Sequence, residues 1–307
     1  MSTLKVAVLG VGLIGGSIGL AAGRRVGAHV VGYDPDAEAL SRAVAVGAIG
    51  ETASDIATAV KDADYVFIAT PVGSAVEVAR AAVAAAGGEC VLSDVGSTKR
   101  HIAREIREPH FVPGHPLAGA ETAGVEGARE DLFDDALWYL TPTDAGEAPA
   151  LARITGLIEQ FGATPVAIEP DAHDRLMASV SHLPHVLANV LVSQAVRSAP
   201  APTATTSGTV ALGTNPSFRD ATRVAGANTA IWTDIYMSNA DLLAEVLDET
   251  IRELSGVRDA LDSEDAVALA TWNERAREAR DRLSGDGAKL GRNGDSGRVT
   301  PPPAQGP

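Results

Sequence analysis

The sequence predicts an α/β fold in which a doubly wound parallel sheet is followed by an all-helical domain. Three observations lead to this prediction. Short β-branched runs alternate with alanine-rich segments of helical composition through the first half of the chain. A glycine-rich turn directly follows the first of these runs. From about residue 170 the apolar residues recur at helical spacing, and no strand-like run interrupts them.

The predicted strands all precede residue 169. They are Lys5–Leu9, His29–Tyr33, Tyr65–Ala69, Cys90–Ser93, His110–Pro113, Leu137–Leu140 and Thr164–Ile168. Helical stretches such as Ala37–Val46 and Ser74–Ala86 separate the early strands, which is the pattern of βαβ units with helices on both faces of a sheet. We therefore expect residues 1–169 to form the first domain.

The helical pattern begins at His173 and continues in Pro216–Ala225, Thr229–Leu254 and Glu264–Leu283. We expect residues 170–283 to form the second, all-helical domain. Residues 284–307 contain six Gly and four Pro among few apolar residues, so we predict a disordered tail.

Composition and charge narrow the choice of partners and compartment. The 307 residues carry 25 Lys and Arg against 40 Asp and Glu, a net charge of −15. Such an acidic surface repels the phosphates of nucleic acids and anionic lipids, so we expect neither as a partner. Cys90 is the only cysteine, which excludes an intrachain disulfide and a multi-cysteine metal site. Because we find no signal peptide and no apolar stretch near the ~18 residues of a membrane span, we expect a cytoplasmic protein.

The glycine-rich turn has the spacing of a dinucleotide-binding motif. It runs Gly10-Val11-Gly12-Leu13-Ile14-Gly15 between the first strand and a helix. The three glycines allow a tight turn, a close approach of the backbone to a pyrophosphate, and close packing of the helix on the strand. The N-terminus of the helix favours the phosphate charge. The first domain is therefore predicted to be a dinucleotide-binding domain of Rossmann type.

Asp34 ends the second predicted strand, 19 residues after Gly15, where such domains carry the acid that binds the ribose. A carboxylate there repels a 2′-phosphate and no arginine follows it directly, so NAD is favoured over NADP. In the alternative interpretation, Asp34 and Asp36 only cap the next helix. Three further residues end strands at the same edge of the sheet and are expected to line the cofactor site: Thr70, Pro71 and Asp94.

Two side chains near this edge have the chemistry of a second site. Ser97 lies where a buried strand gives way to a helix, so its hydroxyl should point into the cofactor crevice. His115 follows the predicted strand at 110–113, and a histidine there can act as a general base near neutral pH. Taken alone, a His-Pro turn is more often structural, and that alternative stays open at this point.

The helical half contributes two further pairs. His182 and His185 are three residues apart on one face of a helix bent at Pro184. A metal site would need a third ligand that is not evident, so we expect no metal. Asp220 and Arg223 also share a face and can pair. Spacing alone does not distinguish this pair from a solvated salt bridge worth under about 1 kcal/mol.

Taken together, the motifs resemble one enzyme family, the prephenate and arogenate dehydrogenases, which are NAD(P)-dependent oxidoreductases of tyrosine biosynthesis. After the glycine turn the likeness runs through DVGSTK, GHPLAGAE, SHLPH, FRDATRVA, Trp232–Ile235 and Ser238-Asn239, and it covers roughly residues 5–255. The resemblance implies NAD-dependent oxidative decarboxylation of prephenate to 4-hydroxyphenylpyruvate. Decarboxylation of arogenate to tyrosine is the alternative, and the sequence does not decide between the two substrates.

The same resemblance implies roles for individual residues. His115 would take the proton of the substrate's C4 hydroxyl as hydride passes to NAD, and Ser97 would hydrogen-bond the same hydroxyl. Arg223 would grip a substrate carboxylate with its planar guanidinium, and Asp220 would orient Arg223. Further pocket residues implied in this way are His185, Trp232 and, in a gating role near the mouth, Glu121. Two other histidines match recurrent family positions and are expected to be structural, namely His173 and His182.

Assembly and regulation follow from the resemblance as expectations. Family members dimerise through the helical half, which is rich in apolar positions here, so we expect a homodimer. Some relatives carry a separate regulatory domain. We expect none in this chain, so any inhibition by tyrosine would occur at the active site. Deleting residues 284–307 should leave turnover intact.

Two other function classes were weighed against this one. The β-hydroxyacid dehydrogenases also join a Rossmann domain to helices, but they need a catalytic lysine on the first helix of the second domain. The lysines of this chain are Lys5, Lys61, Lys99 and Lys289, so residues 100–288 have none. A non-catalytic NAD-binding sensor would bind NAD without turnover and would have no use for Ser97, His115 and Arg223.

Overall fold

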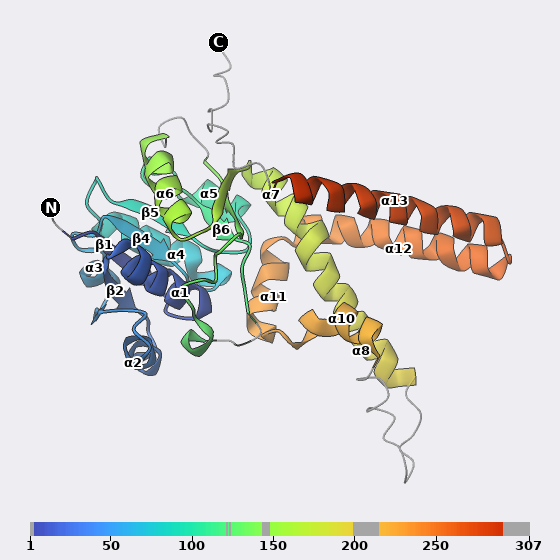
Figure 1. Ribbon diagram of the computed structural model, residues 1–307, viewed down its shortest axis with the longest axis horizontal. Coiled ribbons are helices and arrows are strands. Elements are labelled where there is room, and N and C mark those ends of the chain that lie inside the picture. The colour runs from blue at the N-terminus through green and yellow to red at the C-terminus, as the bar shows by residue number, and fades with distance from the viewer. Residues whose placement is uncertain (1–2, 121, 123, 143–147, 199–214, 291–307) are drawn as a thin grey trace, which may run out of the picture. The chain divides into compact units, whose positions relative to one another are not determined.

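The computed structural model describes residues 3–120, 122, 124–142, 148–198 and 215–290, with side chains placed up to residue 283. Contacts divide the chain into two compact units, Met1–Leu243 and Ala244–Pro307. The first unit contains both β-sheets and the helices up to α11 (Figure 1). The boundary expected near residue 169 falls inside this first unit, and the division into a cofactor domain and a helical domain stays a prediction.

The main sheet has five parallel strands in the order β3-β2-β1-β4-β5. They are β3(Glu51–Thr52), β2(His29–Tyr33), β1(Lys5–Leu9), β4(Tyr65–Ile68) and β5(Val91–Asp94). The strand order reverses on either side of β1, so the carboxyl ends of β1 and β4 lie at the switch point where open α/β sheets bind ligands. The predicted doubly wound sheet is confirmed, with β3 as an additional short edge strand.

Helices cover both faces of this sheet (Figure 1). Side chains alternate along β1, so Val6 and Val8 join one core cluster while Ala7 and Leu9 join the other. The first cluster packs against α1(Leu13–Ala21), α2(Ala37–Ala45) and α6(Ala148–Gln160). The second cluster packs against α3(Ile56–Val60), α4(Val72–Ala85) and α5(Arg100–Glu105). Burial on both faces explains why β1 is apolar at consecutive positions.

A second sheet differs from the prediction. It contains β6(Gly114–Pro116), β7(Leu137–Leu140) and β8(Thr164–Ala167), with β6 antiparallel and β8 parallel to β7. The strand predicted at 110–113 was wrong: Phe111 makes only an isolated bridge with Leu92. The strand begins at Gly114 instead, so His115 lies within β6, opposite Tyr139, rather than in the loop after it.

The described residues that follow β8 are mainly helical, as predicted. Their elements in the first unit are α7(Pro170–Met177), the π-turn η4(Ala178–His182), α8(Leu183–Ser198), α10(Pro216–Thr222), the 3-10 turn η5(Arg223–Gly226) and α11(Thr229–Ser238). Pro184, the second residue of α8, has no N–H for the helical ladder, and the π-turn before it takes up the change of register. The π-turn thus lies directly before α8, and the expected bend at Pro184 stays a prediction.

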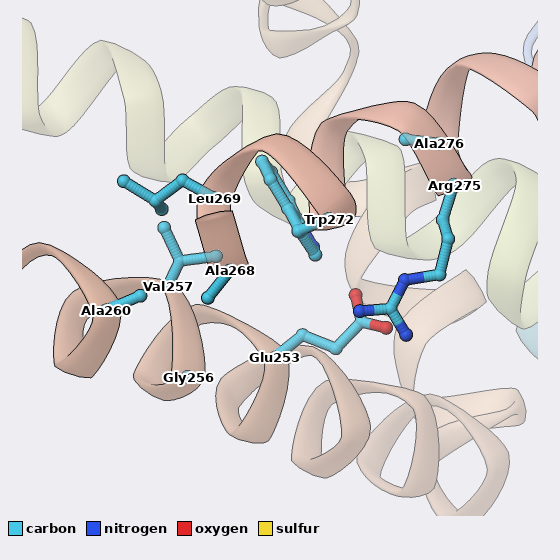
Figure 2. Close-up of a pocket in the computed structure, with 9 residues that line it drawn as sticks. All are labelled: Glu253, Gly256, Val257, Ala260, Ala268, Leu269, Trp272, Arg275 and Ala276. Carbon is cyan, nitrogen blue, oxygen red and sulfur yellow. The ribbon is translucent and has the colours of Figure 1, made fainter. Parts of the chain in front are cut away.

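The second unit contains the rest of α12(Ala240–Asp262) and all of α13(Ala266–Leu290). Side chains of the two helices line an open groove of about 640 Å³ that includes Val257, Leu269 and Trp272 (Figure 2). The helix was expected to end at Leu283 but continues to Leu290, so the predicted disorder of 284–290 was wrong. The rest of the predicted tail, 291–307, lies outside the described residues.

One helical segment contradicts the expectation that no stretch could span a membrane. Among the described residues, 170–198 form a segment with mean hydropathy 1.3 that is long and apolar enough by length and composition, and 28% of its apolar window is buried. This is weak support for a membrane span, because a helix that packs on another protein surface meets the same criteria. Near its start, His173 and Asp174 are fully buried and bonded to other residues of the first unit.

Candidate active site

The glycine loop has the geometry that a dinucleotide requires. Gly10 has a φ of +97°, and its N–H donates to the carbonyl of Tyr33 at 2.8 Å. A Cβ on Gly10 would lie 2.6 Å from the carbonyl oxygen of Ala69, and one on Gly15 would lie 1.9 Å from the carbonyl oxygen of Gly10. A Cβ on Gly12 would meet nothing within 4 Å. Two glycines are thus required by the fold, and the third leaves open space beside the loop.

The first turn of α1 and the end of β4 offer hydrogen-bonding groups to a ligand at this edge. Gly12 is the N-cap of α1 and provides no side-chain cap, and no acidic residue lies in the first turn, which begins with Leu13 and Ile14. Its N–H groups can therefore bind a phosphate. Thr70 follows β4, and its Oγ1 is buried without a hydrogen-bond partner among the described residues. Pro71 is the exposed N-cap of α4. These features fit a bound dinucleotide.

Asp34 fastens the glycine loop to the end of β2. Its carboxylate accepts hydrogen bonds from the N–H groups of Val11 at 3.0 Å and Asp36 at 2.9 Å. Each oxygen keeps a further lone pair for a ribose hydroxyl. The alternative capping role falls to Asp36 instead, whose side chain accepts from the N–H of Glu38 and caps α2.

The carboxylate of Asp94 is buried among protein groups and does not face open space. Asp94 is 1% exposed, and its carboxylate accepts from the N–H of Gly96 at 2.8 Å and of Gly114 at 3.2 Å. The ammonium of Lys99, itself fully buried, pairs with the same carboxylate and also donates to the carbonyl of Gly114 at 2.7 Å. The cofactor contact expected of Asp94 has no support in this arrangement, because protein groups surround the carboxylate.

The two predicted catalytic residues are neighbours of the groups that Asp94 binds. Ser97 follows Gly96 in the half-buried loop between β5 and α5, and His115 follows Gly114 on β6. One carboxylate therefore fastens both segments, which come from different sheets. This long-range contact binds the residues before Ser97 and His115 to the same carboxylate, and the catalytic roles of Ser97 and His115 stay predictions.

His115 is suited to accept a proton. Burial lowers the pKa of its imidazole well below 6.5, and the nearby His173, Lys99 and His182 lower it further. The ring is therefore neutral at physiological pH, which is the form that a general base needs. Its Nδ1 lies 2.9 Å from Nε2 of His173. Within the described residues, Nε2 of His115 bonds to no protein group.

His173 was expected to be structural, yet the structure places it against His115. Its Nδ1 lies 2.8 Å from Oδ1 of Asp174, and both residues lie on α7, which begins at Pro170. Sequence reasoning assigned no role to Asp174 or Lys99. An adjacent His-Asp pair near the start of a helix was the available signal, but the sequence does not show that His173 faces a residue 58 positions earlier.

His185 on α8 and Trp232 on α11, both predicted to be pocket residues, are in contact with each other. Their rings stack with centroids 3.6 Å apart and 2° between the planes, and His182 meets the same indole edge-on at 6.3 Å. The Nε2 atoms of both histidines are buried and have no hydrogen-bond partner among the described residues. Burial lowers the pKa of His182 to about 4 and also lowers the pKa of His185. Two neutral imidazoles thus have hydrogen-bonding capacity for a ligand.

The structure places the remaining predicted residues as follows. Arg223 begins η5 with an exposed side chain, and η5 packs against α8, the helix that carries His185. Asp220 is exposed on α10, one turn before Arg223. Glu121 lies outside the described residues. The stacked pair and Arg223 therefore belong to one neighbourhood, whereas nothing places Glu121.

Family comparisons match this architecture in two parts. The model described as "Prephenate dehydrogenase, nucleotide-binding domain" matches residues 19–167, and the model described as "Prephenate dehydrogenase, dimerization domain" matches residues 169–274. Together they extend over most of the chain, and they meet where the sequence predicts the boundary between the α/β and helical parts.

Individual relatives agree. The chain is 34% identical to the prephenate dehydrogenase of Bacillus subtilis, over 92% of this chain and 77% of that protein, and 34% identical to the cyclohexadienyl dehydrogenase of Zymomonas mobilis, over 92% and 96%. The Aquifex aeolicus prephenate dehydrogenase structure with hydroxyphenyl propionate and NAD+ superposes with a TM-score of 0.83 at 26% identity, covering 92% and 99%. Synechocystis arogenate dehydrogenase gives 0.74 at 25%, covering 91% and 100%. The chain therefore belongs to the prephenate dehydrogenase family.

Proposed function

We propose that the protein is an NAD-dependent prephenate dehydrogenase that oxidatively decarboxylates prephenate to 4-hydroxyphenylpyruvate. The observation that carries this proposal is that one buried carboxylate, Asp94, binds the backbone N–H groups of Gly114 and Gly96, the residues directly before His115 and Ser97, beside the carboxyl edge of the Rossmann sheet. In this proposal, a neutral base and a hydroxyl act beside the sheet edge that also carries the glycine loop. Family membership and relatives of that name support the same reaction.

The chain's own groups account for the proton in this reaction. Nε2 of His115 takes the proton of the C4 hydroxyl as C4 is oxidised to a carbonyl. Bound NAD supplies the acceptor for the hydride that leaves C4. Loss of the ring carboxylate as carbon dioxide returns its bonding electrons to the ring, and His115 gives its proton back to the resulting phenolate oxygen. Ser97 holds the C4 oxygen throughout, and Arg223 binds a carboxylate of the substrate.

The cofactor assignment rests on the glycine loop and Asp34. Gly10 and Gly15 allow the close turn, Gly12 leaves room for the pyrophosphate, and Asp34 accepts from the adenosine ribose. We assign this role to residues 1–169 and substrate binding and dimerisation to residues 170–283, a division supported by the meeting point of the two family models between residues 167 and 169.

The test is NADH formation by the purified protein with NAD and either prephenate or arogenate, followed by absorbance. We expect turnover of prephenate, and His115→Asn should lower it by about 10²- to 10⁴-fold because the general base is lost. His101→Asn, an exposed histidine on α5, is the matched control. Turnover of arogenate alone would mean that the protein is an arogenate dehydrogenase with the same mechanism. If neither substrate reacts while NAD binds, the non-catalytic sensor is the better description.

We also propose that the protein acts as a cytoplasmic homodimer. The matched helical model is a dimerization domain. Large apolar side chains are exposed on η4, α8 and α11, namely Val180, Val190, Leu191, Val196, Ile231 and Met237. Burying such a face against a second copy would remove it from water. A monomeric mass by light scattering at micromolar concentration would contradict this proposal.

A further inference from the structure

The inference concerns how the chain sets the protonation of His115. It begins at Asp174, whose side chain is fully buried. Oδ1 of Asp174 accepts from the N–H of Lys99 at 2.7 Å and Oδ2 from the N–H of Arg100 at 2.9 Å. Burial raises the pKa of this carboxyl, but hydrogen bonds from His173 and the two backbone N–H groups outweigh burial and lower it overall. Asp174 is therefore ionised and can only accept hydrogen bonds.

The state of Asp174 decides which nitrogen of His173 carries a proton. Because Oδ1 of Asp174 lies 2.8 Å from Nδ1 of His173, that nitrogen must donate. Burial lowers the pKa of His173, so the ring holds a single proton near neutral pH. Its Nε2 is then a bare acceptor. The ring is fully buried and meets Tyr139 edge-on at 5.6 Å, which restricts its rotation.

The same argument applies to the protonation of His115. Its Nδ1 lies 2.9 Å from the bare Nε2 of His173, so Nδ1 must donate. A neutral imidazole with its proton on Nδ1 has a lone pair on Nε2, the atom that a base uses. The tautomer of His115 thus follows from two hydrogen bonds that end at a carboxylate on α7. The logic is that of a catalytic triad, in which a buried acid orients a histidine.

We propose that His173 and Asp174 are positioning residues that hold His115 in the Nδ1-protonated tautomer, with Nε2 ready to accept the substrate proton. Asp174 also binds the backbone that follows Ser97 and Thr98, so one carboxylate aligns the base and the loop that carries the hydroxyl. The inference rests on the proposed function, in which His115 is the base. The hydrogen-bond chain itself can be tested without substrate.

Two variants of His173 separate the two bonds. In His173→Gln, the amide oxygen reaches the position of Nε2 and can accept from His115. In His173→Asn, the shorter amide takes the position of Nδ1, keeps the contact with Asp174 and does not reach His115. We expect His173→Asn to lower kcat on the order of 10²-fold, the scale of a wrongly oriented or wrongly protonated base, with little change in KM. His173→Gln should recover most of that loss. A purely structural role would make both variants alike.

The direct readout is the ¹⁵N NMR spectrum of the histidine side chains in the full-length protein. With seven histidines in the chain, single-site variants can assign His115. We expect Nδ1 to be protonated in the wild-type protein and the two tautomers to mix in His173→Asn. A wild-type spectrum with the proton on Nε2 would overturn the inference, and so would unchanged kcat in His173→Asn. If the wild-type protein turned over neither substrate, the proposed function would fail, while the spectrum would still decide the hydrogen-bond chain.

Discussion

The imidazole of His185 lies flat on the indole of Trp232, with ring centroids 3.6 Å apart. This stack joins α8 to α11, and the adjacent phenol of Tyr236 bonds Nδ1 of His185. Because Nδ1 is engaged, Nε2 is the nitrogen left for a ligand, and it has no partner among the described residues. The orientation of His185 therefore depends on an aromatic residue 47 positions away in the chain.

Replacing Trp232 should weaken substrate binding more than it slows chemistry. Trp232→Leu removes the stack, and aromatic pairs contribute about 0.5–1.5 kcal/mol beyond burial, so we expect the KM for prephenate to rise about 2- to 10-fold. Trp232→Phe retains an aromatic ring and should stay near the wild type. The KM for NAD is the internal control. If steady-state kinetics showed a raised KM for NAD instead, the stacked pair would contact the cofactor and not the substrate.

The glycine loop offers a matched pair of variants. Gly10→Ala introduces a side chain at a φ of +97° and 2.6 Å from the carbonyl oxygen of Ala69, so we expect a loss of stability of about 1–3 kcal/mol. Gly12→Ala meets no protein atom within 4 Å. Its Tm should stay unchanged while the Kd for NAD rises at least about 10-fold, because the methyl group enters the space proposed for the pyrophosphate. Thermal unfolding and NAD titration measure the two effects. Unchanged NAD affinity in Gly12→Ala would show that the cofactor does not bind against this loop.

The buried pair of Lys99 and Asp94 should be costly to break. Lys99→Met leaves Asp94 without its counter-charge in a site where both side chains are at most 1% exposed, and removing one partner of a buried pair costs about 3–5 kcal/mol. Lys61→Met, at an exposed lysine, should change the free energy of unfolding by less than about 0.5 kcal/mol. Urea unfolding of the two variants at neutral pH makes the comparison. Equal stabilities would mean that the Lys99 ammonium is dispensable.

Stability should fall on mild acidification because of His182. Burial lowers the pKa of His182 from 6.5 to about 4, so between these values the unfolded chain binds a proton that the native protein does not. Stability therefore rises with pH through this window and is lost as pH falls. From about pH 7 to about pH 5 this group alone should remove on the order of 2 kcal/mol.

The matched variant for this pH effect is His182→Asn. It should unfold with a shallower dependence of the free energy of unfolding on pH, even if it is less stable overall. His101→Asn, which replaces an exposed histidine on α5, is the control variant. The measurement is urea unfolding at several pH values between 5 and 7. A wild-type slope in His182→Asn would contradict the assignment.

Much of the proposed cofactor site could be predicted from the sequence, because its requirements are local in the chain. The requirements of the glycine loop lie within six consecutive residues and in the spacing to Asp34, and a positive φ at Gly10 or a close approach at Gly15 restricts the residue type directly. The periodicity of apolar residues likewise predicted the parallel strands and the helices after residue 169, because burial on both faces leaves a continuous apolar run.

The surroundings of His115, the proposed base, are determined by the tertiary structure and could not be predicted from the sequence. The strand that holds His115 begins four residues later than its composition suggests, because β7 pairs with residues 114–116 and not with 110–113. Asp94 was predicted to face the cofactor, but backbone groups of two segments and Lys99 surround it. His173 contacts His115 across 58 residues. Sequence spacing determines what lies on one strand edge or helix face. Contacts between distant segments depend on how the whole chain packs, and those contacts set the partners of Asp94 and His115.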